Sequence, residues 1–186
     1  MRRAALARTI LTSAAVLLGS TVLWALMAGA ASAEESPLEV AIKATDLYKF
    51  AAFVDWPPSA FSGPAEPTIL CITGDDPFGP LLDQAVRGQK IGLRPVVVTR
   101  LDRVERGAAC HVLFVAPSRR QSPAEALDKV RGLPVLTVTD AADGAARGMI
   151  DFVLKDSRVR FRIDLKAAER GGLTISSKLL GLAVKP

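Results

Sequence analysis

The segment from Arg147 to Ala183 constrains the fold more than any other part of the chain. It begins with an apolar run, Met149 to Leu154, which only Asp151 interrupts. A short polar turn follows, and basic and apolar residues then alternate as Arg158, Val159, Arg160, Phe161, Arg162 and Ile163. Alternation with a period of two residues on the far side of a short turn predicts an antiparallel hairpin with one solvated face.

The rest of this segment predicts three short elements. Leu165 to Arg170 can form a brief helix, because Gly171-Gly172 follows and glycine accepts the positive φ of a helix C-terminus. Leu173 to Ile175 is then an extended piece. The apolar tail that ends at Ala183 is expected to pack back on the core.

The N-terminus has the pattern of a secretory signal peptide. Three arginines, Arg2, Arg3 and Arg8, precede an uncharged and mostly apolar stretch from Ile10 to Ala31, and the small residues Ala31-Ser32-Ala33 follow. This pattern predicts cleavage after residue 33 and export from the cytoplasm, with the choice between the general and the twin-arginine route left open. The alternative is an uncleaved anchor, since the apolar stretch approaches the ~20 residues that span a bilayer.

Cleavage would leave residues 34–186, 153 residues, which is the length of one domain. The whole-chain net charge of +5 includes the three arginines of the signal peptide, so the remainder carries 21 basic against 19 acidic residues. Only 5% of the chain is aromatic. This balance gives no reason to expect nucleic-acid binding.

The first helix of the mature chain is expected from Leu38 to Asp55. Ser36 and Pro37 suit its N-cap and first position. Its apolar residues recur at helical spacing, which places Lys43, Asp46 and Lys49 on the other side, and Phe50 and Phe53 widen the apolar stripe, which suggests a helix covered on more than one side. Trp56-Pro57-Pro58 ends the helix, and Trp56 is expected to be partly exposed.

The middle of the chain alternates short apolar runs with helical stretches. The runs are Thr68 to Thr73, Leu93 to Leu101, Cys110 to Ala116 and Leu133 to Val138, and helices are expected near residues 80–87 and 123–131. This alternation predicts an α/β fold: a layered, mostly parallel sheet flanked by helices, with the antiparallel C-terminal hairpin at one edge.

The two cysteines, Cys71 and Cys110, both lie in predicted strands. An even count in an exported chain favours one disulfide between them. The alternative is a pair of buried free thiols, which is also a common state of cysteine.

One candidate ligand cleft lies after the first of these strands. Gly74, Asp75, Asp76 and Phe78 follow the carboxyl end of the strand, where α/β folds place their ligands. The alternative is that Asp76 caps a helix beginning at Pro77, and we favour this structural role.

The sequence predicts no catalytic site. His111 is the only histidine, and because it is adjacent to Cys110 in a strand, the two side chains point to opposite faces and cannot form a catalytic pair. Neither a GxGxxG motif nor a P-loop is present. We therefore expect no enzyme activity, no metal and no cofactor.

A candidate partner-binding patch combines the hairpin with the C-terminal tail. It consists of basic strand residues and a neighbouring apolar stretch: Arg160, Arg162, Lys178, Leu179 and Leu180. Such a patch suits an acidic partner or an anionic ligand. The alternative is a solvated strand face that discourages edge pairing.

Several motifs together resemble the YfiR family of exported bacterial proteins. In the C-terminal segment, these are the R-F-x-I strand, the short alanine-containing helix, Gly-Leu and the run I-S-S-K-L-L-G-L-A. Upstream, ATDLYKFAAFVDWP (44–57) and ITGDDPFG (72–79) match in the expected order. The chain departs from the family pattern at Asp164, Gly181 and Arg147, where asparagine, a basic residue and a second glycine are common.

The resemblance implies a non-enzymatic, homodimeric periplasmic protein. The type member binds the periplasmic sensor part of an inner-membrane diguanylate cyclase and represses it, and an outer-membrane-associated partner relieves the repression by sequestering it. Other members accompany sensor kinases and membrane receptors. A small-molecule-binding module for such a kinase or receptor is therefore the alternative function.

Overall fold

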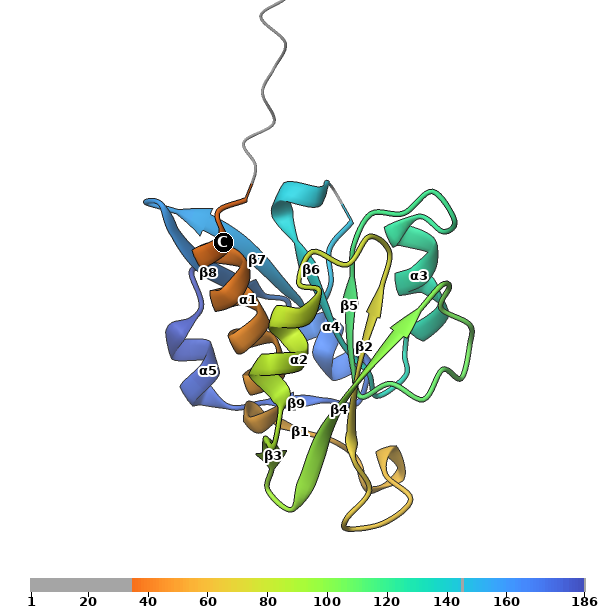
Figure 1. Cartoon of the computed structure of the whole chain (residues 1–186). Coiled ribbons are helices and arrows are strands. Elements are labelled where there is room, and N and C mark those ends of the chain that lie inside the picture. Colours follow the sequence, from red (N-terminus) through yellow and green to blue (C-terminus); the bar gives the residue numbers. More distant parts are fainter. Residues whose placement is uncertain (1–34, 145, 186) are drawn as a thin grey trace, which may run out of the picture. The chain divides into compact units, whose positions relative to one another are not determined.

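A seven-stranded sheet forms the centre of the computed structural model, which describes residues 35–144 and 146–185 (Figure 1). The predicted signal peptide and its cleavage site lie outside the described residues. Across the sheet, the order is β3-β4-β2-β5-β6-β7-β8. The strand bounds are β2 Thr68–Thr73, β3 Lys90–Ile91, β4 Arg94–Leu101, β5 Val112–Val115, β6 Leu136–Asp140, β7 Ile150–Lys155 and β8 Arg158–Ile163.

The five central strands are parallel, and the short β3 and the long β8 pair antiparallel at the two edges. When the five parallel strands are numbered in chain order, their order across the sheet is 2-1-3-4-5, which is one of the common orders of a doubly wound sheet. The predicted fold class, a mostly parallel layered sheet with an antiparallel C-terminal hairpin, is confirmed.

Helices cover both faces of this sheet. The α1 (Pro37–Phe50), α2 (Pro80–Val86) and α5 (Ser177–Leu182) helices contribute to the larger core on one face. On the opposite face, α3 (Pro123–Val130) packs over a smaller core that contains both cysteines. The short α4 (Leu165–Arg170) follows the hairpin and adds Ala168 to the larger core. In the part of the chain that the structure describes, no helix has the length and hydropathy needed to cross a bilayer.

The first helix begins as predicted but ends earlier. The Ser36 hydroxyl accepts a hydrogen bond from the Glu39 amide, and the Glu39 carboxylate accepts one from the Ser36 amide. Beyond Phe50 the chain makes a 3₁₀ turn, Ala51–Phe53, and then the short strand β1, Val54–Asp55. This strand pairs with β9, Thr174–Ile175, so a partner near the C-terminal end of the fold overrides the helical pattern.

One residue on the first helix is placed differently from the prediction. Lys49 is exposed, as expected, but Lys43 is buried and pairs with Asp140 at the end of β6. The helix lies against the sheet on this side, and the ammonium group finds a carboxylate there. Periodicity alone could not reveal that partner.

The C-terminal hairpin has the predicted geometry. Residues 150–155 of β7 pair in antiparallel register with 163–158 of β8, which places Phe152 opposite Phe161 on the core face. Both rings contact Phe50 of α1, with centroids 5.5 and 5.0 Å from its ring. The two turn residues, Asp156 and Ser157, have φ values of 52° and 54°. This is the backbone of the turn that suits the right-handed twist of a two-stranded hairpin.

Replacing Ser157 with glycine is expected to stabilise the protein by about 0.5–1 kcal/mol. A non-glycine residue pays a steric cost at positive φ that glycine avoids. Urea denaturation measures the change in the free energy of unfolding. The control is Arg158→Gly, one residue later in an extended strand, where glycine should destabilise. The turn interpretation is wrong if Ser157→Gly lowers stability as Arg158→Gly does.

Candidate functional site

At the carboxyl ends of the strands, where folds of this class bind ligands, the loops after β2 and β5 are in close contact. Gly74 follows β2 with a φ of 89°, and a Cβ atom there would lie 2.3 Å from the carbonyl oxygen of Ala116. The Asp75 amide donates to the carbonyl of Pro117 at 2.9 Å. The two loops therefore pack backbone against backbone, and only glycine fits at this contact.

Of the four residues of the predicted ligand cleft, Gly74, Asp75 and Asp76 line surface pockets, and Phe78 does not. Gly74 and Asp75 line a surface pocket of about 550 Å³ together with Leu101, Asp102, Ser118, Arg119 and Arg120. Phe78 instead lies in the core, 2% exposed, with its ring 4.8 Å from that of Phe114. A cleft built from all four side chains is therefore not present, and a ligand at Gly74 and Asp75 stays a prediction.

Asp76 has a structural role, although not the predicted one. Its Oδ1 accepts hydrogen bonds from the amides of Phe78 (2.8 Å) and Gly79 (3.2 Å), which shapes the turn before α2. The helix itself begins at Pro80 with Gly79 at its N-cap, so the expectation that Asp76 caps a helix starting at Pro77 is wrong. Its Oδ2 accepts from Arg100 Nε at 2.8 Å.

Arg100 connects this turn to α2. Its guanidinium donates hydrogen bonds to Asp83 at 2.9–3.1 Å as well as to Asp76. Both interactions raise the pKa of Arg100, and the hydrogen bond to Asp83 has the larger effect. The Asp76 carboxylate is therefore occupied by protein donors. Among the described residues, no cluster of three or more histidine, cysteine or acidic side chains could hold a metal ion.

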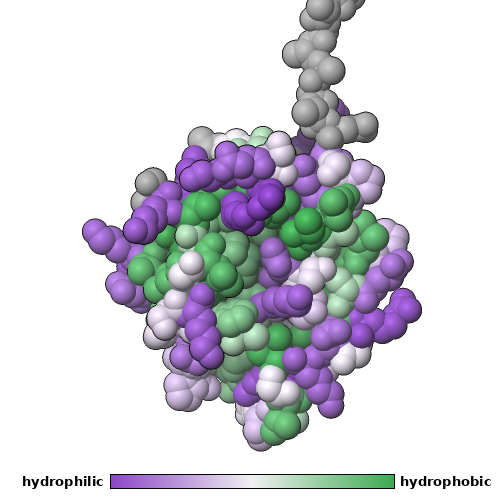
Figure 2. Space-filling model, turned by 90° about the vertical axis from the view of Figure 1, so that its left-hand side faces the viewer, coloured by the Kyte–Doolittle hydropathy of each residue, from purple (hydrophilic) through white to green (hydrophobic). Residues whose placement is uncertain are grey.

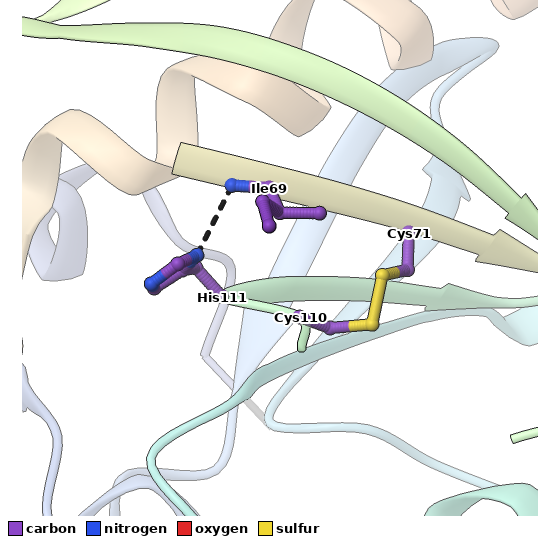
Figure 3. The surroundings of a disulfide bond; sticks show 4 residues. All are labelled: Ile69, Cys71, Cys110 and His111. Atoms are coloured by element: carbon purple, nitrogen blue, oxygen red, sulfur yellow. Dashed lines mark hydrogen bonds between the residues drawn. A yellow bond between two sulfur atoms is a disulfide. The ribbon is translucent and has the colours of Figure 1, made fainter. Parts of the chain in front are cut away.

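A disulfide joins Cys71 of β2 to Cys110, just before β5, with the two Cα atoms 5.8 Å apart (Figure 3). The predicted pairing is present. His111 lies beside it, and its ring points away from the sulfur atoms (Figure 3). Its Nδ1 accepts from the Ile69 amide at 3.0 Å, which requires an unprotonated Nδ1 and places the ring hydrogen on Nε2.

A second pocket lies at the amino end of β2. It has a volume of about 620 Å³, and its wall includes Trp56, Phe61, Thr68, Ile91 and Arg94. Two buried polar atoms on this wall, Trp56 Nε1 and Thr68 Oγ1, have no hydrogen-bond partner among the described residues. Buried polar groups are normally paired, and each of these two atoms would gain a partner if a water or ligand reached it.

Sequence reasoning did not predict this pocket. Its walls come from the end of the first helix, the loop after it, β2 and the β3–β4 hairpin, which meet only in the folded chain. The one usable signal was Trp56 between a helix end and two prolines, and the expectation that it would be partly exposed is correct.

The predicted partner-binding patch is divided between two faces of β8. Arg160 and Arg162 alternate with Val159 and Phe161, so the arginines project from the face opposite α1. The remaining three residues lie on α5, which packs on the α1 side, where Lys178 is exposed, Leu180 is half-buried and Leu179 is a core residue. Both groups flank the same sheet edge, because the Val184 amide donates to the Phe161 carbonyl.

Arg162 also takes part in a network around the buried Asp151. This carboxylate is 4% exposed and accepts hydrogen bonds from Thr139 Oγ1 (2.9 Å), Arg147 Nη1 (2.6 Å) and Arg162 Nη2 (3.4 Å). Arg147, which departs from the family pattern, therefore balances a buried charge. On β8, the charged side chains most accessible to a partner are those of Arg158 and Arg160, which are exposed.

The face of the molecule that carries this edge has hydrophobic patches between hydrophilic side chains (Figure 2). Two exposed leucines belong to the elements at this edge: Leu154 of β7 is 60% exposed and Leu182 of α5 is 63% exposed. Basic side chains and exposed leucines on the elements of one sheet edge are a composition suited to a protein partner with an acidic rim.

Comparison with known proteins gives one finding. A family model described as YfiR/HmsC-like matches residues 40–184. A search of curated proteins found none that matches the chain.

Proposed function

The chain belongs to the YfiR/HmsC-like family, and from this membership we propose that it is a periplasmic protein that inhibits an inner-membrane diguanylate cyclase. It binds the periplasmic sensor part of the cyclase and lowers the output of cyclic-di-GMP without contacting the nucleotide. The match over 40–184, nearly the whole mature chain, is the observation that carries the proposal. A homodimer and an outer-membrane-associated partner that sequesters the protein belong to the same proposal.

The edge of the sheet formed by β8 and α5 is the contact surface that we propose for the cyclase. It combines exposed charge on Arg160 and Lys178 with half-buried Leu180. Leu179 is a core residue, and it supports this surface from beneath rather than meeting the partner. In this proposal, Arg162 contacts the partner while it remains paired with Asp151.

The test of the function is the cyclic-di-GMP content of host cells. Deleting the gene is expected to raise it, and expressing the exported wild-type protein is expected to lower it again. A version without residues 1–33 stays in the cytoplasm and is expected to have no effect. Unchanged cyclic-di-GMP in all three strains would remove the diguanylate cyclase as the target and favour a sensor kinase.

Reversing the charge of Arg160 to glutamate is expected to weaken binding to the periplasmic part of the partner about tenfold. Rim charges steer association and act mainly on the association rate, so the loss should shrink at high salt. Biolayer interferometry at low and high salt measures both effects. Arg106→Glu is the matched control, because Arg106 is exposed in the loop after β4, away from this edge. Equal affinities for the two variants would exclude the β8 surface.

A small-molecule-binding role is the second candidate, and the unpartnered Trp56 and Thr68 atoms favour it. The pocket beside them, about 620 Å³, is in the range of volumes that hold small ligands. A thermal-shift screen of amino acids, nucleobases and vitamins tests this role. A true ligand should raise the Tm of the wild type more than that of Trp56→Phe, which keeps an aromatic ring and removes the indole N–H. If no compound raises the Tm, this candidate fails.

A further inference from the structure

The loop from Pro57 to Pro67, hereafter the 57–67 loop, is attached to the sheet through His111. The ring hydrogen on Nε2 is donated to the Ala60 carbonyl oxygen at 3.0 Å. On the other side of the ring, Nδ1 accepts from the Ile69 amide of β2 at 3.0 Å (Figure 3). One neutral imidazole therefore connects the loop to the sheet, and it can do so in only one protonation state.

Phe61 is the second contact of the loop. Its ring stacks on the His111 ring, with centroids 4.1 Å apart and planes 11° from parallel. The guanidinium carbon of Arg94 lies 3.6 Å from the centroid of the same ring, and Arg94 Nη1 donates to the carbonyls of Gly63 (2.6 Å) and Glu66 (3.0 Å). The described backbone hydrogen bonds of residues 58–66 stay within the loop. Side chains therefore hold the loop in place.

Protonation would disrupt the hydrogen bond at Nδ1 of His111, whereas Nε2 would still carry its hydrogen. A charged imidazole carries a hydrogen on each nitrogen, so Nδ1–H would face the Ile69 N–H, donor against donor. The strand cannot move away, because the His111 amide donates to the Ile69 carbonyl at 2.9 Å and its carbonyl accepts from Leu136 at 2.8 Å. The disulfide fixes the preceding residue, Cys110, to β2. The ring must turn, and turning breaks its contacts with the loop.

We propose that His111 is a pH-dependent switch whose protonation releases the 57–67 loop from the sheet and reshapes the pocket beside it. Trp56, Phe61 and Gly63 all line that pocket, so movement of the loop changes the wall directly. The proposal does not rest on the regulatory function above. Release of the loop would change the pocket for any ligand or partner that binds at this end of the sheet.

Four influences set the pH range of the switch. Burial, the largest, lowers the pKa of His111, while the bond to the Ala60 carbonyl raises it. Of the charged groups that face the ring, Glu66 in the loop raises the pKa and Arg94 on β4 lowers it. With the folded pKa depressed, the attached state is complete above the ordinary histidine value of about 6.5 and is lost as the pH falls through the lower, folded value.

The chain offers two independent probes of this switch. His111 is the only histidine, so the imidazole titration of untagged protein can be followed directly by NMR. Trp56 contacts Phe61, with ring centroids 6.1 Å apart, and in the full chain carrying Trp24→Phe it is the only indole. Between pH 7.5 and pH 5, we expect the Trp56 emission to change with the same midpoint as the imidazole titration.

His111→Gln is the matched control, since glutamine offers a donor and an acceptor and does not titrate in this range. Its Trp56 emission is expected to be constant between pH 7.5 and pH 5. A transition of equal size in His111→Gln would overturn the proposal. If that variant does not fold, the wild type still decides: an imidazole that titrates without a matching change in Trp56 emission would also overturn it.

Discussion

Replacing Lys43 with methionine is expected to lower the free energy of unfolding by about 3–5 kcal/mol. The Lys43 side chain is 8% exposed and its ion-pair partner, the Asp140 carboxylate, is 9% exposed. Methionine fills much of the same volume but leaves the carboxylate without its cation, and an unpaired buried charge is among the costliest defects that a single substitution makes. Urea denaturation of the wild type and the variant measures the difference.

Two further variants separate the charge from the packing. Lys43→Met combined with Asp140→Asn removes both charges, while the asparagine oxygen can still accept the hydrogen bond from the Ala142 amide. This double variant is expected to recover most of the loss. Lys49→Met, on the exposed side of the same helix, should change stability by less than about 0.5 kcal/mol. A loss in Lys43→Met no larger than that in Lys49→Met would show that the ion pair does not stabilise the fold.

Removing the disulfide is expected to cost about 3–4 kcal/mol of stability. The bridge closes a loop with a sequence separation of 39 residues, and in the chain-entropy model a loop of this length restricts the unfolded chain by that amount. It also joins β2 directly to the strand beside it, so two central elements of the sheet are held in register. The variant Cys71→Ala/Cys110→Ala tests the effect without leaving a polar thiol in the smaller core.

The measurement is chemical denaturation of the wild type and the double variant, each with and without a reductant. The reductant should lower the stability of the wild type toward that of the variant and leave the variant unchanged. A difference below about 1 kcal/mol between oxidised wild type and variant would mean that the bridge contributes little. Equal sensitivity of both proteins to the reductant would assign the effect to something other than this bond.

Local patterns in the sequence were enough to predict much of the fold. The alternation around Phe161 predicted the hairpin, the Ser36 and Pro37 pair predicted the start of α1, and the spacing of apolar runs predicted a mostly parallel sheet. These signals work because each depends on neighbours within a few residues. The pairing of Cys71 with Cys110 followed from export and from the cysteine count.

The features that were missed depend on contacts between distant segments. The burial of Lys43 follows from Asp140, 97 residues away, and the early end of α1 follows from the pairing of Val54 with Ile175. The contact of His111 with Ala60 joins residues 51 positions apart. Such pairs leave no periodic signal in one sequence. For this reason, the pocket beside Trp56 could be found only in the structure.

The most direct test of the proposed function uses the membrane cyclase itself. The full-length diguanylate cyclase of the same host is reconstituted in vesicles with its sensor part facing outward, and the formation of cyclic-di-GMP is measured inside. Adding the purified protein outside the vesicles is expected to lower the rate, with less inhibition by Arg160→Glu than by Arg106→Glu. A rate that is unchanged at saturating protein would contradict the proposal that this chain acts by binding and inhibiting a membrane diguanylate cyclase.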